Sequence, residues 1–157
     1  MKKLLKISSV LSIFVGVIMI SGGLWGIIFT YKNVVRENIV TPVGSAIPGV
    51  LVSGPLTLKA QADIMRVHVL ETTGGKTYSE MPSQIPKLDE KGNPVLDATG
   101  KPVMVPNDAR NLWVTATALI TALNLGIVTY AFSGLVLLFG LISIWTGVVF
   151  YFLSKKS

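Results

Sequence analysis

The sequence contains no cysteine, and this absence excludes disulfide bonds, thiolate metal sites, iron–sulfur clusters and a cysteine nucleophile. Charged residues are also scarce, at 14% of the chain, whereas soluble domains contain about 25%. Hydrophobic residues make up 50% of the chain. The composition therefore favours a membrane protein over a soluble domain.

Histidine is almost absent as well, because His68 is the only one in the chain. An iron site of the facial-triad type requires two histidines and a carboxylate, and a catalytic zinc site normally requires three protein ligands. His68 and Glu71, which share a face of a predicted helix with Ile64, provide too few ligands for either metal. We expect no metal and no cofactor, and a His68 that is partly buried or lies at an interface and is hydrogen-bonded to the backbone or to Glu71.

Residues 74–77, GGKT, match only the end of a phosphate-binding loop. The full motif, G-x-x-x-x-G-K-[ST], lies between a strand and a helix. Here Leu70 stands where the first glycine should be, and the segment follows a predicted helix instead of preceding one. The sequence therefore predicts no nucleotide binding, and Gly74 and Gly75 are expected to end a helix.

The basic residues are not arranged as in a nucleic-acid-binding protein. All 8 acidic residues and nine of the 14 basic residues lie between Lys32 and Arg110, so the middle of the chain is nearly neutral. No basic stripe with interleaved aromatic residues is present, and we expect no binding of nucleic acid. The excess of positive charge lies at the two ends, at Lys2, Lys3, Lys6, Lys155 and Lys156.

Two long segments, residues 7–29 and 112–153, contain no charged residue. The first is about 34 Å long as a helix, enough to cross a hydrocarbon core of about 30 Å. A cleaved signal peptide is the alternative, but the apolar run continues past the small residues Ser21 and Gly23. The second segment is about twice the length of one span, so it forms either two membrane helices or one helix that projects beyond the bilayer.

The lysines at both ends favour two spans, because basic residues that flank spans stay in the cytoplasm. We predict a cell-membrane protein with cytoplasmic termini at 1–6 and 154–157 and transmembrane helices at 7–29 and 131–153. The second helix is expected to begin near Asp108, a good N-cap, so that residues 108–130 form a stalk outside the membrane. Thr117, Thr121 and Asn124 form a mildly polar stripe on this stalk, which faces protein or water.

Residues 30–107 are expected to form a small extracytoplasmic α+β cap, in a protein that is otherwise mainly α. Residues 38–58 are rich in β-branched residues, proline and glycine, which predicts one or two short strands. Residues 59–73 predict a short helix. The segments DEKGNPVL (89–96) and DATGKPVM (97–104) repeat with a period of eight, and each copy predicts a tight turn followed by extended residues.

Small residues recur at every seventh position in both long helices, and small side chains allow membrane helices to approach closely. A strict period of seven predicts a left-handed crossing. We therefore expect these residues to pack the two helices together. They are Ser9, Gly16, Gly23 and Thr30 in the first helix, and Gly126, Ser133, Gly140, Gly147 and Ser154 in the second.

Residues 53–81 and 118–141 resemble a family of small actinobacterial-type membrane proteins with two spans. The specific part of the resemblance is the run Ala60 to Ile64 with His68, followed by the run Thr73 to Tyr78. Such proteins are often labelled aromatic ring-opening dioxygenases, although this chain lacks the ligands of an iron site. The resemblance implies the architecture and a structural or partner-binding role for Gln61, Asp63, His68, Gly74, Gly75 and Tyr78.

Nothing in the sequence marks a nucleophile or a catalytic pair of acid and base, and neither span has a central charge of the kind that transport paths need. We therefore expect no catalytic residues and a small integral membrane protein that is not an enzyme and has a structural or partner-binding role. Its expected partners are membrane lipid and another membrane protein or a second copy of itself. Two alternatives are an accessory subunit of a larger membrane complex, such as a respiratory assembly, and a membrane-anchored enzyme.

Overall fold

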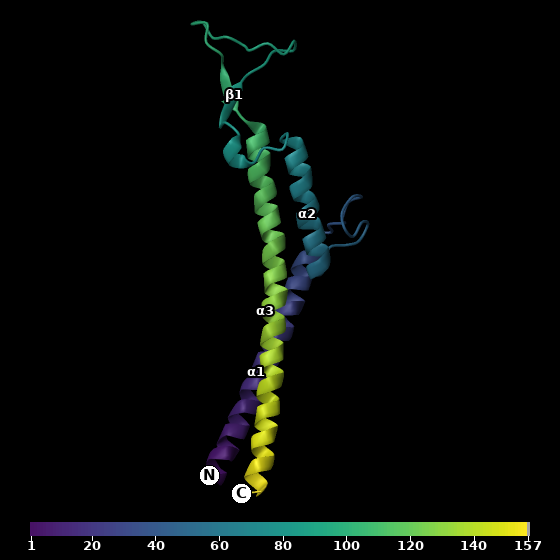
Figure 1. Ribbon diagram of the computed structural model, residues 1–157, viewed down its shortest axis with the longest axis vertical. Helices are drawn as coiled ribbons and strands as arrows, with labels where there is room; N and C mark the ends of the chain where they lie inside the picture. The colour runs from purple at the N-terminus through teal and green to yellow at the C-terminus, as the bar shows by residue number, and fades with distance from the viewer. Residues whose placement is uncertain (157) are drawn as a thin grey trace.

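The computed structural model describes residues 1–156 as a long helical hairpin that has a small cap near one end (Figure 1). The amino and carboxyl ends of the chain lie at the same end of the hairpin, and the cap lies towards the opposite end. The elements in chain order are α1 (Lys2–Val35), α2 (Pro55–Thr72), the 3-10 helix η1 (Tyr78–Glu80), β1 (Gln84–Pro86), β2 (Met104–Pro106) and α3 (Asp108–Lys156).

The helices α1 and α3 are both long and apolar enough to cross a membrane. With 34 and 49 residues they are about 51 and 74 Å long at 1.5 Å per residue. Only 11% of the residues in the most apolar window of each helix are buried, so most of each apolar window is exposed on the surface of the chain. Because α3 continues without a break, residues 112–153 belong to one helix and not to two.

The small residues at every seventh position lie in the contact between α1 and α3, which we call the α1–α3 seam. In the antiparallel pair, Gly16 lies opposite Gly140: a Cβ atom on Gly16 would be 2.7 Å from the carbonyl oxygen of Gly140, and one on Gly140 would be 3.0 Å from that of Gly16. Real Cβ atoms essentially never come within 3.0 Å of another atom, so the two backbones are in direct contact. The buried residues of the seam are Ser9, Gly16, Gly23, Thr30, Ser133, Gly140, Gly147 and Ser154.

Two hydroxyl groups join the helices across the seam. Ser9 Oγ donates a hydrogen bond to the carbonyl oxygen of Gly147 at 2.7 Å, and Ser143 Oγ donates one to that of Ser12 at 2.8 Å. Bonds of this kind between membrane helices contribute about 0.6 kcal/mol on average, so close packing is the larger contribution to the seam.

Gly126 is the one member of the period-seven series that does not face α1. It is half-buried, and a Cβ atom on it would lie 3.1 Å from Leu58 Cδ1 of α2. At this level α2 occupies the space beside α3, which is why the series changes partner there.

The helix α2 begins at Pro55, four residues before the predicted start at residue 59. Proline suits the first turn of a helix, and Thr57 Oγ1 accepts hydrogen bonds from the backbone N–H groups of Ser53 and Gly54 at 2.9 and 3.1 Å. The helix ends at Thr72 with Thr73 as its C-cap, and Gly74 and Gly75 follow with φ angles of +64° and +79°, which favour glycine.

The cap packs on α3 through two small apolar clusters, one of Val52, Leu58, Ala62 and Leu123, the other of Val69, Met81, Trp113 and Ala116. Tyr130 on α3 adds a hydrogen bond from its hydroxyl group to the carbonyl oxygen of Ser53, at 2.7 Å. These contacts hold α2 alongside the half of α3 that extends beyond the end of α1 (Figure 1).

The strands predicted for residues 38–58 are not formed. The chain makes one isolated β-bridge, between Val40 and Leu51, and its last residues belong to α2. Backbone N–H groups of Thr41 and Val52 donate to the carbonyl oxygens of Val50 and Ile39 at 3.0 and 2.8 Å, so the two arms of the loop pair only around this bridge. The buried Thr41 adds to this pairing, because its Oγ1 accepts a hydrogen bond from the N–H of Val50 at 3.0 Å and donates to the carbonyl oxygen of Ile47.

The eight-residue repeat forms two similar turns between β1 and β2, which pair antiparallel. Asp89 Oδ1 accepts hydrogen bonds from the backbone N–H groups two and four residues later, and Asp97 Oδ1 does the same. The hydrogen bonds from Thr99 and Lys101 hold the pKa of Asp97 below its usual range. Backbone bonds from Lys87 to Val103, from Val95 to Lys87 and from Val103 to Val95, at 2.7 to 2.8 Å, close the repeat into a ring.

We expect the change Gly23→Leu to destabilise the hairpin by about 1–3 kcal/mol, the usual cost of overpacking. A Cβ atom at Gly23 would lie 2.7 Å from Leu137 Cγ and 2.9 Å from the carbonyl oxygen of Ser133. The matched control is Gly22→Leu, because a Cβ atom at Gly22 meets nothing within 4 Å. The free energy of unfolding in mixed micelles measures the difference, and an equal loss in both variants would contradict the close approach.

Candidate functional site

Two adjoining hollows lie between α2 and α3, and together we call them the α2–α3 groove. It consists of two parts, of about 510 and 230 Å³, that share Met65 and Leu119 in their walls. The main wall residues are Gln61, Met65, His68, Val69 and Thr72 of α2, and Leu112, Thr115, Leu119, Ala122 and Leu123 of α3; Asn33, Val34 and Glu37 close the end nearest α1.

Each wall of the groove is one face of a helix. On α2 the residues at 61, 65, 68 and 72, and on α3 those at 112, 115, 119 and 122, follow the spacing of three and four that brings side chains to the same side. Each set extends about 16 Å along its helix at 1.5 Å per residue. The groove is therefore a straight, mainly apolar channel about three helical turns long.

One polar atom inside this apolar channel has no partner. Gln61 Oε1 is buried and accepts no hydrogen bond from any residue described, 1–156. A buried acceptor without a donor costs about 1–3 kcal/mol, so this oxygen favours an occupant that brings a hydrogen-bond donor.

His68 lies on the rim of the groove and is exposed, which corrects the expectation of a partly buried side chain bonded to the backbone or to Glu71. Its own carbonyl oxygen accepts a hydrogen bond from Thr72 Oγ1 at 2.8 Å. Ile64, which was predicted to share a helix face with His68, is buried in the cap. His68 lies one turn further along α2, where the groove is open.

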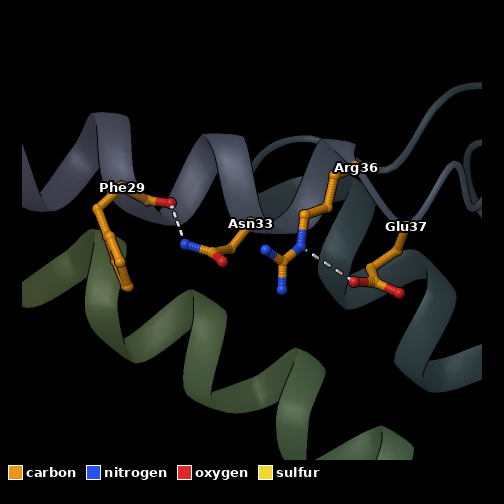
Figure 2. A network of polar contacts seen from close by, with 4 residues as sticks. All are labelled: Phe29, Asn33, Arg36 and Glu37. Atoms are coloured by element: carbon orange, nitrogen blue, oxygen red, sulfur yellow. Dashed lines mark hydrogen bonds and ion pairs between the residues drawn. The ribbon is translucent and has the colours of Figure 1, made fainter.

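Figure 2 shows polar contacts near the end of α1, where Asn33 and Glu37 line one end of the groove. Asn33 Nδ2 donates a hydrogen bond to the carbonyl oxygen of Phe29 at 2.8 Å, and Arg36 Nε lies 3.4 Å from Glu37 Oε1. The two charged side chains are 71% and 60% exposed, so their ion pair contributes little stability. Glu37 remains accessible as an acceptor at the edge of the groove.

The other residues of the sequence motif lie outside the groove. Asp63 forms an exposed ion pair with Lys59, one turn earlier on α2. Gly74 and Gly75 end α2, and the N–H of Gly75 donates to the carbonyl oxygen of Leu70 at 2.7 Å. Tyr78 packs on α3, where the guanidinium carbon of Arg110 lies 4.0 Å from its ring centroid. The structure thus brings Gln61 and His68 together in the groove and gives the rest of the motif positions that shape the cap.

Within residues 1–156 the histidine, aspartate and glutamate side chains form no group of three that could hold a metal ion. No family model, curated protein or solved structure was found to match the chain. The resemblance to the two-span family therefore stays a prediction.

No pattern in the sequence pointed to Met65, Leu119 and Ala122 as wall residues. The only signal was the stretch without charge at 112–130, because an uncharged helix outside a membrane needs a covering surface. Contacts between distant residues, such as Leu58 with Leu123, determine which side of this uncharged stretch of α3 is covered by α2.

We expect the change Gln61→Met to raise the free energy of unfolding by about 1 kcal/mol, since methionine has a similar length and no unpaired acceptor. Asp63→Asn, two residues along the same helix, is the control, and its exposed ion pair is worth less than about 0.5 kcal/mol. Thermal unfolding in detergent compares the variants. A loss of stability in Gln61→Met would show that the carboxamide already has a partner.

Proposed function

We propose that the protein is a membrane-anchored docking subunit of a larger membrane complex. The helices α1 and α3 cross the cell membrane with both termini in the cytoplasm, and the cap and the upper half of α3 project outside. There the α2–α3 groove binds a helix of the partner.

The charges on α2 support this position of the membrane. Lys59, Asp63 and Arg66 are exposed on α2, and charged side chains are costly inside a bilayer. The level of α2 therefore lies outside the lipid, together with the part of α3 that packs against it. The lysines at the two ends of the hairpin favour the cytoplasmic side for both termini.

The observation that most favours docking is an apolar channel at a level where no lipid covers it. The part of α3 beside α2 has no charged residue after Arg110, and Leu119 is 49% exposed in the groove. A channel between two helices with walls at spacings of three and four fits the recognition mode in which a helix lies in a groove. Gln61 and Glu37 then select a helix that presents hydrogen-bond donors to them.

Filling the groove tests the proposal. We expect the wild-type protein, solubilised in a mild detergent, to migrate in native electrophoresis within an assembly much larger than itself. Ala122→Trp places an indole ring in the groove and is expected to release the protein from that assembly. Asn124→Trp adds the same ring to an exposed position two residues away, outside the groove, and is expected to leave the assembly intact.

Two outcomes would overturn the proposal. In the first, the wild-type protein migrates by itself or only as a small oligomer of its own chain. In the second, the Ala122→Trp and Asn124→Trp variants remain in the assembly to the same extent. Circular dichroism of both variants verifies that the helices are intact.

A further inference from the structure

One face of α3 contacts neither α1 nor α2, and we call its residues the outer stripe. They are separated by four and three positions in turn, and all of them are exposed, with Val114, Leu125 and Val128 at 52%, 60% and 62%. The outer stripe consists of Val114, Ala118, Thr121, Leu125 and Val128 beside the cap, and continues towards the chain end with Phe132, Leu135, Phe139 and Ile142.

This spacing is that of a coiled-coil interface. A repeat of 3.5 residues keeps the same face of a helix directed at a partner along its whole length when the two helices wind around each other. Beside the cap, the line at Thr117, Thr121 and Asn124 is more polar than the outer stripe. Away from the groove, the outer stripe is thus the best apolar contact line that this part of α3 offers.

The length of the outer stripe specifies what can cover it. The stripe passes without interruption from the level of α2, outside the lipid, into the part of α3 that pairs with α1. Lipid can cover only the second part. A partner for the whole stripe must be an uncharged helix that crosses the membrane and projects outward by the same distance.

A second copy of the chain provides such a helix. We propose that two copies pair through their outer stripes as a parallel dimer with a two-fold axis along the membrane normal. This inference uses the membrane orientation of the proposed function but not the groove. Because both copies insert with the same orientation, equivalent residues lie at the same height, and each stripe residue meets its counterpart.

The charge pattern of α3 suits contact between identical helices. Between Arg110 and Lys155 the helix has no charged residue, so a two-fold pair brings no like charges together along this length. Residues next to the stripe, such as Thr117 and Ala122, are uncharged too. At the upper end, a hollow of about 460 Å³ between Tyr78 and Val114 gives a side chain of the second helix a place to insert.

Cysteine crosslinking tests the dimer directly, because the chain has no cysteine of its own. Single cysteines at positions 114 to 128 are oxidised in isolated membranes with copper phenanthroline. In a parallel pair the Leu125→Cys residues of two copies come within the Cα separation of a disulfide, about 4.4–6.8 Å. We expect this variant to give at least ten times more covalent dimer than Asn124→Cys, which is exposed on another face.

The profile along the helix decides between the outcomes. The inference predicts maxima at Ala118, Thr121, Leu125 and Val128, with the repeat of 3.5 residues. Equal yields at all positions would indicate random collisions and overturn it, as would maxima at Leu119 and Ala122, which lie in the groove.

The dimer and the docking function can fail separately. A periodic crosslinking profile in a protein that migrates without a large assembly would retain the dimer and remove the docking function. A flat profile in a protein that stays in an assembly sensitive to Ala122→Trp would remove the dimer and leave the docking function.

Discussion

The structure depends on one contact, the approach of the α1 and α3 backbones at their glycines. Gly16 and Gly140 lie opposite each other so closely that neither position has room for a Cβ atom. In the proposed membrane position, helix association would have no hydrophobic driving force, so this packing and the hydrogen bonds of Ser9 and Ser143 would hold the hairpin together. The same contact fixes the register of the helices, and the register determines how far α3 extends beyond the end of α1.

The unequal lengths of α1 and α3 account for the rest of the molecule. Beyond Val35, α3 loses its first partner, and after a loop the chain continues in the same direction as α2, which covers part of the exposed helix. One helix of 18 residues covers only one side of α3, which leaves a groove along the edge of the contact and a bare face on the far side. Both surfaces are apolar because α3 has no charged residue from Leu112 to Leu153. The two proposed interactions, docking in the groove and pairing through the outer stripe, use these two surfaces.

The sequence predicted the features that depend on local chemistry or on a long period. The series of small residues, the start of α3 at Asp108 and the end of α2 at Gly74 and Gly75 are examples. Prediction from the sequence failed where a contact between distant residues determines the local structure. Residues 38–58 have the composition of strands, but the two arms of that loop pair only around the bridge between Val40 and Leu51, and the last residues belong to α2. The position of His68 and the contact of Gly126 with Leu58 depend on where α2 docks, which no local pattern contains.

The central claim is a membrane hairpin that exposes its cap outside and keeps both termini inside. The most direct measurement is labelling of single cysteines in intact cells with a membrane-impermeant maleimide, since the chain has no native cysteine. Ser83→Cys, exposed in the cap, is predicted to react, whereas Leu4→Cys, 73% exposed near the amino end, is predicted to react only after the membrane is opened. Labelling of Leu4→Cys in intact cells, or protection of Ser83→Cys, would contradict the account.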